Sequence, residues 1–243
     1  MNRAAVIVLG PDRAAVSGVS THVNLLLGSR LADDFELVHF QVGSEGREEG
    51  APARWLRLLA SPFALALAIL ARHAAIVHLN TSLNPRAYWR DLAYLAVAKC
   101  CGARVLYQVH GGALPQDFFA RSRLLTAFLR ATLRAPDVIV VLAQCELAAY
   151  RRFVPAQNVA VLPNGIDCRP FDSTPTVRSF PEQPLRLLYI GRIAREKGLY
   201  EILQGMRLAD KLGVDARLIV NACHRPICIN NCIASVSVPT LFE

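Results

Sequence analysis

The sequence predicts an α/β protein with a doubly wound, mostly parallel sheet, followed by the start of a second domain of the same kind. Short apolar runs alternate with helical patterns along residues 1–168. The runs are apolar throughout, which is typical of parallel strands covered by helices on both faces. After a proline-rich stretch, the same alternation starts again at residue 185.

Each predicted element of the first domain has its own pattern. The segment 19–31 carries apolar residues along one helical side, and 104–109 is rich in β-branched and aromatic residues. The segment 55–71 is strongly apolar but contains Ser61-Pro62, so we expect a helix that is kinked or begins afresh there. The predicted strands are 4–9, 35–40, 76–79, 104–109, 138–142 and 159–162. The predicted helices are 19–31, 55–71, 88–101, 118–134 and 144–153.

The rest of the chain divides into three parts. Residues 169–184 contain four prolines among Ser and Thr, which indicates a linker. A strand at 185–190, a loop at 191–198, a helix at 199–212 closed by Gly213 and a strand at 216–220 form one βαβ unit. The alternation then stops, so we expect 221–243 to be an atypical tail of a truncated second domain.

Composition narrows the classes of function. A formal charge of +8 and a hydrophobic fraction of 53% favour a globular protein with acidic partners such as nucleotides, phosphates or an anionic membrane surface. Nucleic acid is disfavoured because the arginines are scattered and form no basic block. Seven cysteines, no evident secretory signal and no disulfide pattern indicate a cytoplasmic protein.

Glycine-containing loops follow several predicted strands, where ligands bind in doubly wound sheets. Gly18 lies at a helix start, where the backbone can approach a ligand and free amides favour an anion. An ordinary glycine turn explains it equally well, and the missing G-x-G-x-x-G argues against NAD or FAD. His110 ends a strand beside Gly111 and can hydrogen-bond a ligand hydroxyl or phosphate.

Two later loops complete the set. Asn164-Gly165 predicts a tight turn into the linker, because both residue types accept positive φ, and places the pair near the cleft. The segment Tyr189–Gly198 is the most informative, since Gly191 ends a strand and Arg192 and Lys197 lie five apart before a helix. Two fixed cations and free helix amides form a diphosphate site, whereas Arg195 and Glu196 fit a solvated loop.

Taken in order, these segments resemble the GT-B glycosyltransferases of the family 4 type, which are retaining enzymes that use nucleotide sugars. The resemblance covers about residues 4–220. Its motifs are Gly18-Val19 with His22-Val23, His110-Gly111, Pro163–Asp167, and Gly191-Arg192 with Glu196-Lys197-Gly198.

The resemblance implies two Rossmann-like domains and transfer of a sugar, with retention, to a saccharide or lipid-linked acceptor in polysaccharide or cell-envelope glycan synthesis. It implies that Arg192, Lys197 and Gly191 bind the donor diphosphate, that Gly18 borders it, and that His110 is catalytic and contacts the donor sugar. It implies no metal or other cofactor.

The sequence departs from the family pattern at three places. Ser17 replaces the first of the usual paired glycines, and Ala143 replaces a helix-capping serine. No Glu-x₇-Glu follows Lys197, although such glutamates bind the donor in this family. A non-catalytic remnant that binds an acceptor or a partner therefore remains the alternative.

Two further signals have competing interpretations. Cys223-His224, Cys228 and Cys232 have no usual zinc spacing, so we expect no metal site. The apolar helix near Leu58–Ala71, with arginines beside it, fits peripheral contact with the inner face of a membrane and equally fits a helix that covers the core.

Overall fold

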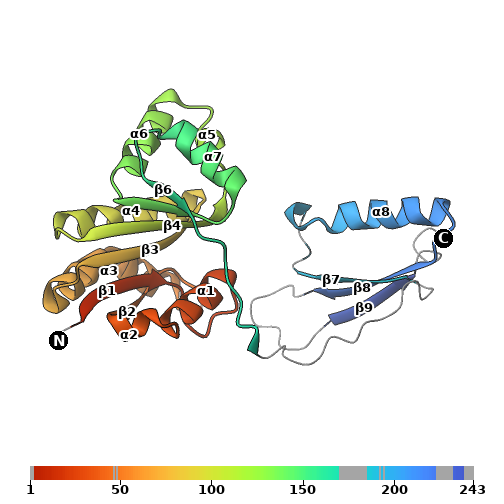
Figure 1. Ribbon diagram of the computed structural model, residues 1–243, viewed down its shortest axis with the longest axis horizontal. Coiled ribbons are helices and arrows are strands. Elements are labelled where there is room, and N and C mark those ends of the chain that lie inside the picture. The colour runs from red at the N-terminus through yellow and green to blue at the C-terminus, as the bar shows by residue number, and fades with distance from the viewer. Residues whose placement is uncertain are drawn as a thin grey trace. The chain divides into compact units, whose positions relative to one another are not determined.

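The structure is a computed structural model that describes residues 3–45, 47, 49–169, 185–191, 193, 195–222 and 232–237. These residues form two compact units, residues 1–168 and the chain from 169 onward (Figure 1). Apart from Arg169, the predicted linker at 169–184 lies outside the described residues.

The first unit is built on a six-stranded sheet with the order β2-β1-β3-β4-β5-β6, in which every neighbouring pair is parallel. This confirms the predicted Rossmann-like α/β class. The strands are β1 (Ala4–Gly10), β2 (Phe35–Gln41), β3 (Ile76–Leu83), β4 (Arg104–Gly112), β5 (Val138–Val141) and β6 (Val159–Val161).

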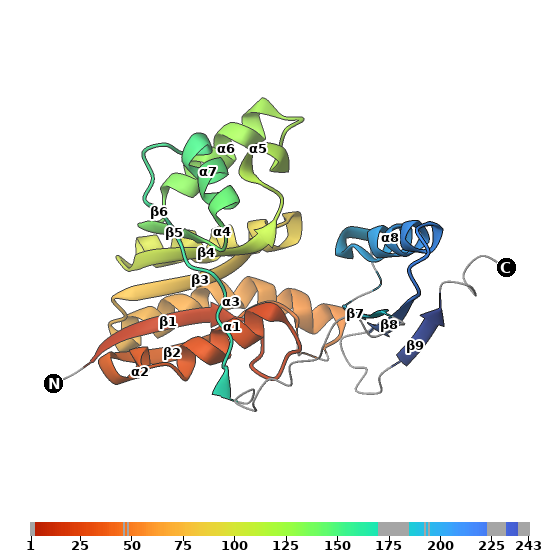
Figure 2. The ribbon, with the colours of Figure 1, turned by 45° about the vertical axis from the view of Figure 1, so that its right-hand side comes forward.

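Helices cover both faces of this sheet, as the alternate side chains of β1 show. Val6 and Val8 pack with Val23 of the first helix, whereas Ile7 and Leu9 belong to the core that the later helices cover. Successive strand residues point to opposite faces, so the sheet is doubly wound (Figure 2). The helices are α1 (Gly18–Leu27), α2 (Leu31–Asp34), α3 (Ala51–Arg72), α4 (Pro85–Cys100), α5 (Pro115–Phe118), α6 (Arg123–Arg134) and α7 (Gln144–Phe153).

Several predicted helices have different bounds in the structure, and three of the differences have a clear physical reason. The helix expected at 19–31 ends at Leu27, because the backbone amide of Gly28 caps it, and α2 follows as a separate short helix. The helix expected at 118–134 begins only at Arg123 as α6, because Ser122 caps its N-terminus by accepting from Leu125 N, and Phe118 instead ends the short helix α5.

The fresh start considered at Pro62 is also wrong. α3 starts at Ala51, with Pro52 in its first turn, and continues through Pro62 to Arg72. Proline removes one intrahelical hydrogen bond, but packing of the flanking turns can hold a helix together across it. Leu65 and Ile69 supply that packing, since both are buried in the main core.

The second unit contains β7 (Leu185–Ile190), a 3-10 turn at Arg195–Lys197, α8 (Leu199–Lys211), β8 (Ala216–Ala222) and β9 (Cys232–Ser237). β7 and β8 are parallel, as a βαβ unit requires, and Tyr189 and Leu218 pack against Met206 of α8. β9 pairs antiparallel with β8. The segment expected to be an atypical tail thus contributes a strand, but not in the parallel pattern.

Two strands of the first sheet approach closely at one glycine. The β3–β4 register shifts between Thr81 and Leu83, and Leu83 pairs with Gly112. Gly112 has φ +106°, and a Cβ there would lie 2.5 Å from the carbonyl oxygen of Leu83. Only glycine satisfies both conditions without displacing the backbone.

We therefore expect Gly112→Ala to lower the free energy of unfolding by about 2 kcal/mol or more. Gly18→Ala is the control, because a Cβ at Gly18 meets nothing within 4 Å and its φ is not positive; its effect should stay within about 1 kcal/mol. Denaturant unfolding of both variants tests this, and equal stabilities would contradict it.

Candidate functional site

The candidate site lies where the winding of the first sheet reverses. The chain leaves β1 toward β2 and then passes back beyond β1 to form β3. At such a reversal the connections diverge beyond the carboxyl ends of the strands and leave a crevice. A cavity of about 190 Å³ opens there. Its lining includes Val19, Gly43, Asn80, Thr81, Arg86 and Arg90.

Asn80 connects three strands at this crevice. It is buried in β3, and its Nδ2 donates to the carbonyl oxygen of Leu9 in β1 at 2.9 Å. That bond fixes the orientation of the amide, so Oδ1 faces the Nε2 of His110 in β4 at 2.8 Å. Oδ1 has no proton to give, and His110 Nε2 must therefore donate.

His110 is accordingly a neutral imidazole with a bare Nδ1. Burial, followed by repulsion between its protonated form and the protonated forms of His22 and His78, lowers the pKa of His110 to about 4. Within the described part of the chain, Nδ1 is buried without a hydrogen-bond partner. An unpaired buried acceptor in a native fold marks a place where a ligand group or a water is expected.

Two more histidines gather around His110. The ring centroid of His22, on α1, lies 4.8 Å from that of His110 and 6.2 Å from that of His78. His78 Nε2 is 2.9 Å from Gln108 Oε1, and burial lowers the pKa of His78 to about 4. Burial also lowers the pKa of His22. His22, His78 and His110 thus form a cluster of imidazoles that are uncharged near neutral pH.

Strand alternation brings these side chains together. His78 and Asn80 are two apart on β3, and Gln108 and His110 are two apart on β4, so all four point to the face that α1 covers. Sequence reasoning singled out His110 but missed His78 and Asn80. The signal was present, because polar residues inside an apolar strand are rarely buried without a specific partner.

A buried ion pair supports the cavity wall. Asp91 on α4 is fully buried and accepts from Arg90 Nε at 2.6 Å and from Thr81 Oγ1 at 2.5 Å. This arrangement fixes the side chain of Thr81 and the guanidinium of Arg90, both of which line the cavity. The cavity therefore has polar walls whose positions are set by bonds to the core.

The start of α1 explains one departure from the family pattern. Ser17 is the N-cap, and its side chain accepts from Ser20 N at 3.2 Å. Gly18 follows as the first helical residue, and an added Cβ there would meet nothing within 4 Å. The fold itself does not require glycine at this position. The role predicted for Gly18, beside a bound phosphate, stays a prediction.

The glycines predicted at two other loops have different conformations. Gly111 has φ +89° at the end of β4, beside His110. Neither Asn164 nor Gly165 has positive φ, and both are exposed in an irregular segment after β6, so the tight turn expected there is wrong. Asn-Gly permits such a turn without requiring it.

Glu146 replaces the N-cap side chain that α7 lacks at Ala143. An alanine side chain cannot accept a hydrogen bond, and none caps α7 at this residue. Glu146 Oε2 instead accepts from Leu142 N at 2.9 Å and from Ala143 N at 3.1 Å. The helix start is thereby stabilised from its third position, as a capping box would do.

The predicted diphosphate residues lie in the second unit. Gly191 follows β7 directly, Lys197 is exposed at the end of the 3-10 turn, and Gly198 has φ +77° before α8. Arg192 lies outside the described residues. Lys197 and the free amides at the start of α8 are thus neighbours along the chain, as the sequence predicts.

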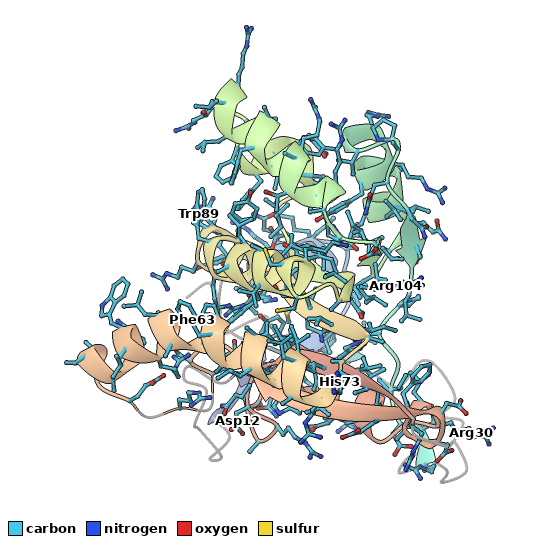
Figure 3. The ribbon with its side chains drawn as sticks, turned by 90° about the vertical axis from the view of Figure 1, so that its left-hand side faces the viewer. Asp12, Arg30, Phe63, His73, Trp89 and Arg104 are labelled. Carbon is cyan, nitrogen blue, oxygen red and sulfur yellow. The ribbon has the colours of Figure 1, made fainter. Side chains whose placement is uncertain are left out.

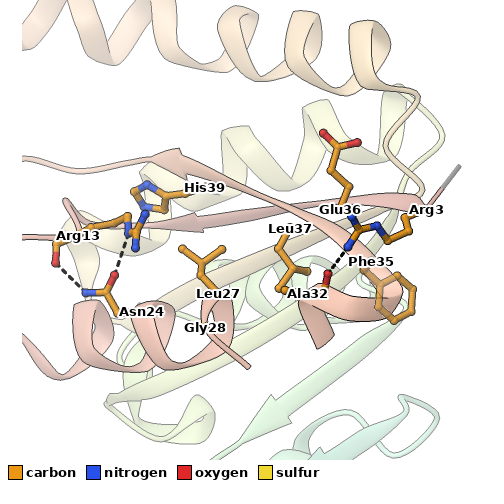
Figure 4. A pocket seen from close by; sticks show the side chains of 10 residues that line it. All are labelled: Arg3, Arg13, Asn24, Leu27, Gly28, Ala32, Phe35, Glu36, Leu37 and His39. Carbon is orange, nitrogen blue, oxygen red and sulfur yellow. Dashed lines mark hydrogen bonds between the residues drawn. The ribbon is translucent and has the colours of Figure 1, made fainter. Parts of the chain in front are cut away.

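A larger groove of about 420 Å³ runs along the edge strand β2 (Figure 4). Its polar groups already bond one another: Arg13 Nε donates to Asn24 Oδ1 at 2.9 Å, and Asn24 Nδ2 donates to the carbonyl oxygen of Arg13 at 2.7 Å. The smaller cavity is the better candidate, because it lies at the carboxyl edge of the sheet where the winding reverses. Across the described residues, no group of three or more His, Cys, Asp or Glu is arranged to hold a metal ion.

Comparison with known proteins places this geometry in a family. The profile of Glycosyltransferase Family 4 matches residues 16–169. Sucrose-phosphate synthase from Thermosynechococcus elongatus is similar in structure, with a TM-score of 0.63 and 14% identity over 92% of this chain. A co-structure of S. aureus MnaA with UDP gives a TM-score of 0.51 and 10% identity, also over 92% of this chain. The chain spans 63% of the length of each. A comparison with curated proteins finds no match.

The lowered pKa of His78 predicts a pH-dependent stability. The imidazole takes up a proton near pH 6.5 when unfolded but only near pH 4 when folded. Its contribution is therefore complete above pH 6.5 and is lost as the pH falls toward 4. Between pH 8 and pH 5 it should lower the free energy of unfolding by about 2 kcal/mol. Denaturant unfolding of His78→Asn at the two pH values should show a smaller loss than the parent; an identical loss would contradict the assignment.

The Asn80 amide predicts the tautomer of His110. Long-range ¹H–¹⁵N spectra at pH 7 should show a protonated Nε2 and a bare Nδ1. Asn80→Ala should give a mixture of tautomers, and Asn80→Asp should raise the pKa of His110 because a carboxylate favours the imidazolium. Asn24→Ala is the control. A protonated Nδ1 in the parent protein would contradict the prediction.

Proposed function

The chain belongs to glycosyltransferase family 4, and from this premise we propose that it transfers a sugar from a nucleotide diphosphate sugar to a saccharide or lipid-linked acceptor. The observation that carries the proposal is the family match over residues 16–169, which include the buried imidazoles at the carboxyl edge of the sheet. We further propose that transfer retains the anomeric configuration and serves polysaccharide or cell-envelope glycan synthesis on the cytoplasmic side.

The proposed binding site for the donor diphosphate lies after β7. Arg192 and Lys197 would neutralise the diphosphate, Gly191 leaves room for it, and the free amides at the N-terminus of α8 supply further donors. α8 is long enough, at 13 residues, for its dipole to favour an anion. With this charge supplied by the protein, departure of the nucleotide diphosphate needs no metal. The similar structure of S. aureus MnaA is a co-structure with UDP, which supports a nucleoside diphosphate as the ligand proposed for this chain.

The proposed sugar contact is His110. A neutral imidazole with a bare Nδ1 can accept a hydrogen bond from a sugar hydroxyl, whereas an imidazolium could not. Gly18, at the N-terminus of α1, would border the donor phosphate, and Gly111, Asn164 and Gly165 would line the cleft. The acceptor would enter the 190 Å³ cavity, whose polar walls suit hydroxyl groups.

Calorimetry with UDP and with GDP tests the proposed diphosphate-binding site. We expect the full chain to bind at least one of them, and Lys197→Ala to weaken binding about tenfold or more, because a charge-assisted contact to phosphate is lost. Arg195→Ala is the matched control, since Arg195 is also exposed in the same 3-10 turn and should leave binding unchanged. Equal losses in both variants would argue against a specific diphosphate site.

A turnover assay distinguishes an active transferase from a non-catalytic remnant. Incubation with UDP- and GDP-sugars should release nucleoside diphosphate, and His110→Ala should abolish the release while nucleotide binding persists. Nucleotide binding without hydrolysis or transfer of any nucleotide sugar would support the non-catalytic alternative. If the chain shows neither nucleotide binding nor turnover, the donor assignment is wrong.

A further inference from the structure

The outward face of α3 is apolar and open to solvent. At 100° per residue, its large exposed side chains fall within an arc of about 120°. They are Trp55, Leu56, Leu59, Phe63, Leu67 and Leu70, which are between 58% and 74% exposed. Alanines fill the adjoining positions, and the charged residues of the helix lie outside this arc. This set of six side chains, here called the α3 face, is far more apolar than an ordinary solvated helix surface.

The opposite flank holds α3 to the first unit. Ser61, Leu65 and Ile69 are buried at intervals of four residues, and Ser61 Oγ lies 2.7 Å from Tyr94 Oη on α4. α3 has the length and hydropathy to cross a bilayer. Crossing would require Leu65 and Ile69 to leave the core. A helix that is anchored along one flank and apolar along the other is suited to lie in the plane of a membrane surface.

The charge of the same region is strongly positive. Residues 51–134 contain eleven Lys and Arg, two Asp and no Glu, an excess of nine against a net charge of +8 for the whole chain, although Arg57 and Arg72 of α3 pair with Glu49 and Glu36. Arg54, Arg86, Arg121 and Arg123 are exposed at or beside the N-termini of α3, α4 and α6. These helices follow parallel strands, so their N-termini share the carboxyl edge of the sheet with the cavity.

Both tryptophans of the chain lie near this edge. Trp55 is in the second turn of α3 and is 63% exposed, and Trp89 is in the second turn of α4 and is 49% exposed. Trp89 and Phe63 project from the same side of the unit (Figure 3). Exposed tryptophan beside arginine is characteristic of a protein surface that meets the interface of a bilayer.

We propose that the α3 face docks on the surface of an anionic lipid bilayer. Its apolar side chains enter the boundary between headgroups and acyl chains, and the surrounding arginines contact lipid phosphates. A second copy of the chain is a poorer occupant, because it would bring two surfaces of the same positive charge together. An anionic bilayer matches both the apolar arc and the charge.

Docking in this way would place the cavity at the membrane. The cavity shares the carboxyl edge with the N-termini of α3 and α4, and Arg86 lines it. A lipid-linked substrate could then reach Asn80 and His110 without leaving the bilayer surface. The docking itself does not depend on transferase activity, so it is tested by binding alone.

Co-sedimentation with vesicles tests the proposal. The full chain should bind vesicles of equimolar phosphatidylglycerol and phosphatidylcholine at least tenfold better than pure phosphatidylcholine, and the preference should shrink at high salt. Phe63→Gln with Leu67→Gln should weaken binding about tenfold or more, because two exposed apolar anchors are lost. In Trp89→Phe, which keeps Trp55 alone, fluorescence should shift to shorter wavelength on binding.

The controls are matched in exposure and chemistry. Leu162→Gln with Ile166→Gln changes two exposed apolar residues of the same unit outside α3 and should bind like the parent. If Phe63→Gln with Leu67→Gln lowers the midpoint of thermal unfolding, the double variant Trp55→Gln with Leu59→Gln is used in its place. Parent-like binding by the α3 variants, equal binding to both vesicle types, or no binding would each overturn the proposal. A dimer that dissociates in the α3 variants without vesicle binding would assign the face to a second copy.

Discussion

The side chain of Asn80 is the interaction on which the site depends. β1 and β3 are neighbours at the point where the winding reverses, and their loops diverge beyond it. One amide reaches across this divergence, donating to Leu9 in β1 and accepting from His110 in β4. Because both ends of the amide are engaged, the orientation and the proton of the imidazole follow from the backbone of a strand two positions away. Loss of either bond would free the ring and leave buried polar atoms unpaired, which is costly in a sheet interior.

A parallel sheet covered on both faces is a demanding place for polar groups, since water cannot replace a missing partner there. The cluster meets this demand by remaining uncharged. Burial lowers the pKa values of His78 and His110 to about 4, so neither imidazole carries a charge into the core near neutral pH. The unmet hydrogen-bonding capacity then remains at a few buried ring and amide atoms of the cluster, His110 Nδ1 among them. A site of this kind discriminates by hydrogen bonding more than by net charge, which suits the hydroxyl groups of a sugar.

The sequence was sufficient for the fold because its apolar strands and amphipathic helices repeat regularly, and β7 and α7 occur at their predicted bounds. It was insufficient where tertiary packing overrides local preference. Pro62 does not end α3, since buried side chains secure the turn after it. Asn164-Gly165 forms no tight turn, since nothing requires positive φ there. His110 was identifiable from its glycine neighbours, whereas Asn80 becomes visible as its partner only when β3 and β4 are set in register. The roles of Gly18, Arg192 and Lys197 remain predictions from the family resemblance.

The distribution of charge separates recognition of the donor from contact with a surface. The imidazoles and amides of the crevice are neutral, and Arg90, the cation deepest in its wall, is paired with Asp91. Exposed arginines lie instead at or beside the N-termini of α3, α4 and α6, namely Arg54, Arg86, Arg121 and Arg123. Of these, Arg54, Arg121 and Arg123 do not line the cavity and are available to a large anionic partner, whereas Arg86 also lines the cavity. The cations proposed for the diphosphate, Arg192 and Lys197, belong to the other unit. A cytoplasmic enzyme with a soluble acceptor would have no need to combine this exposed charge with an uncovered apolar helix, whereas a membrane surface engages both at once.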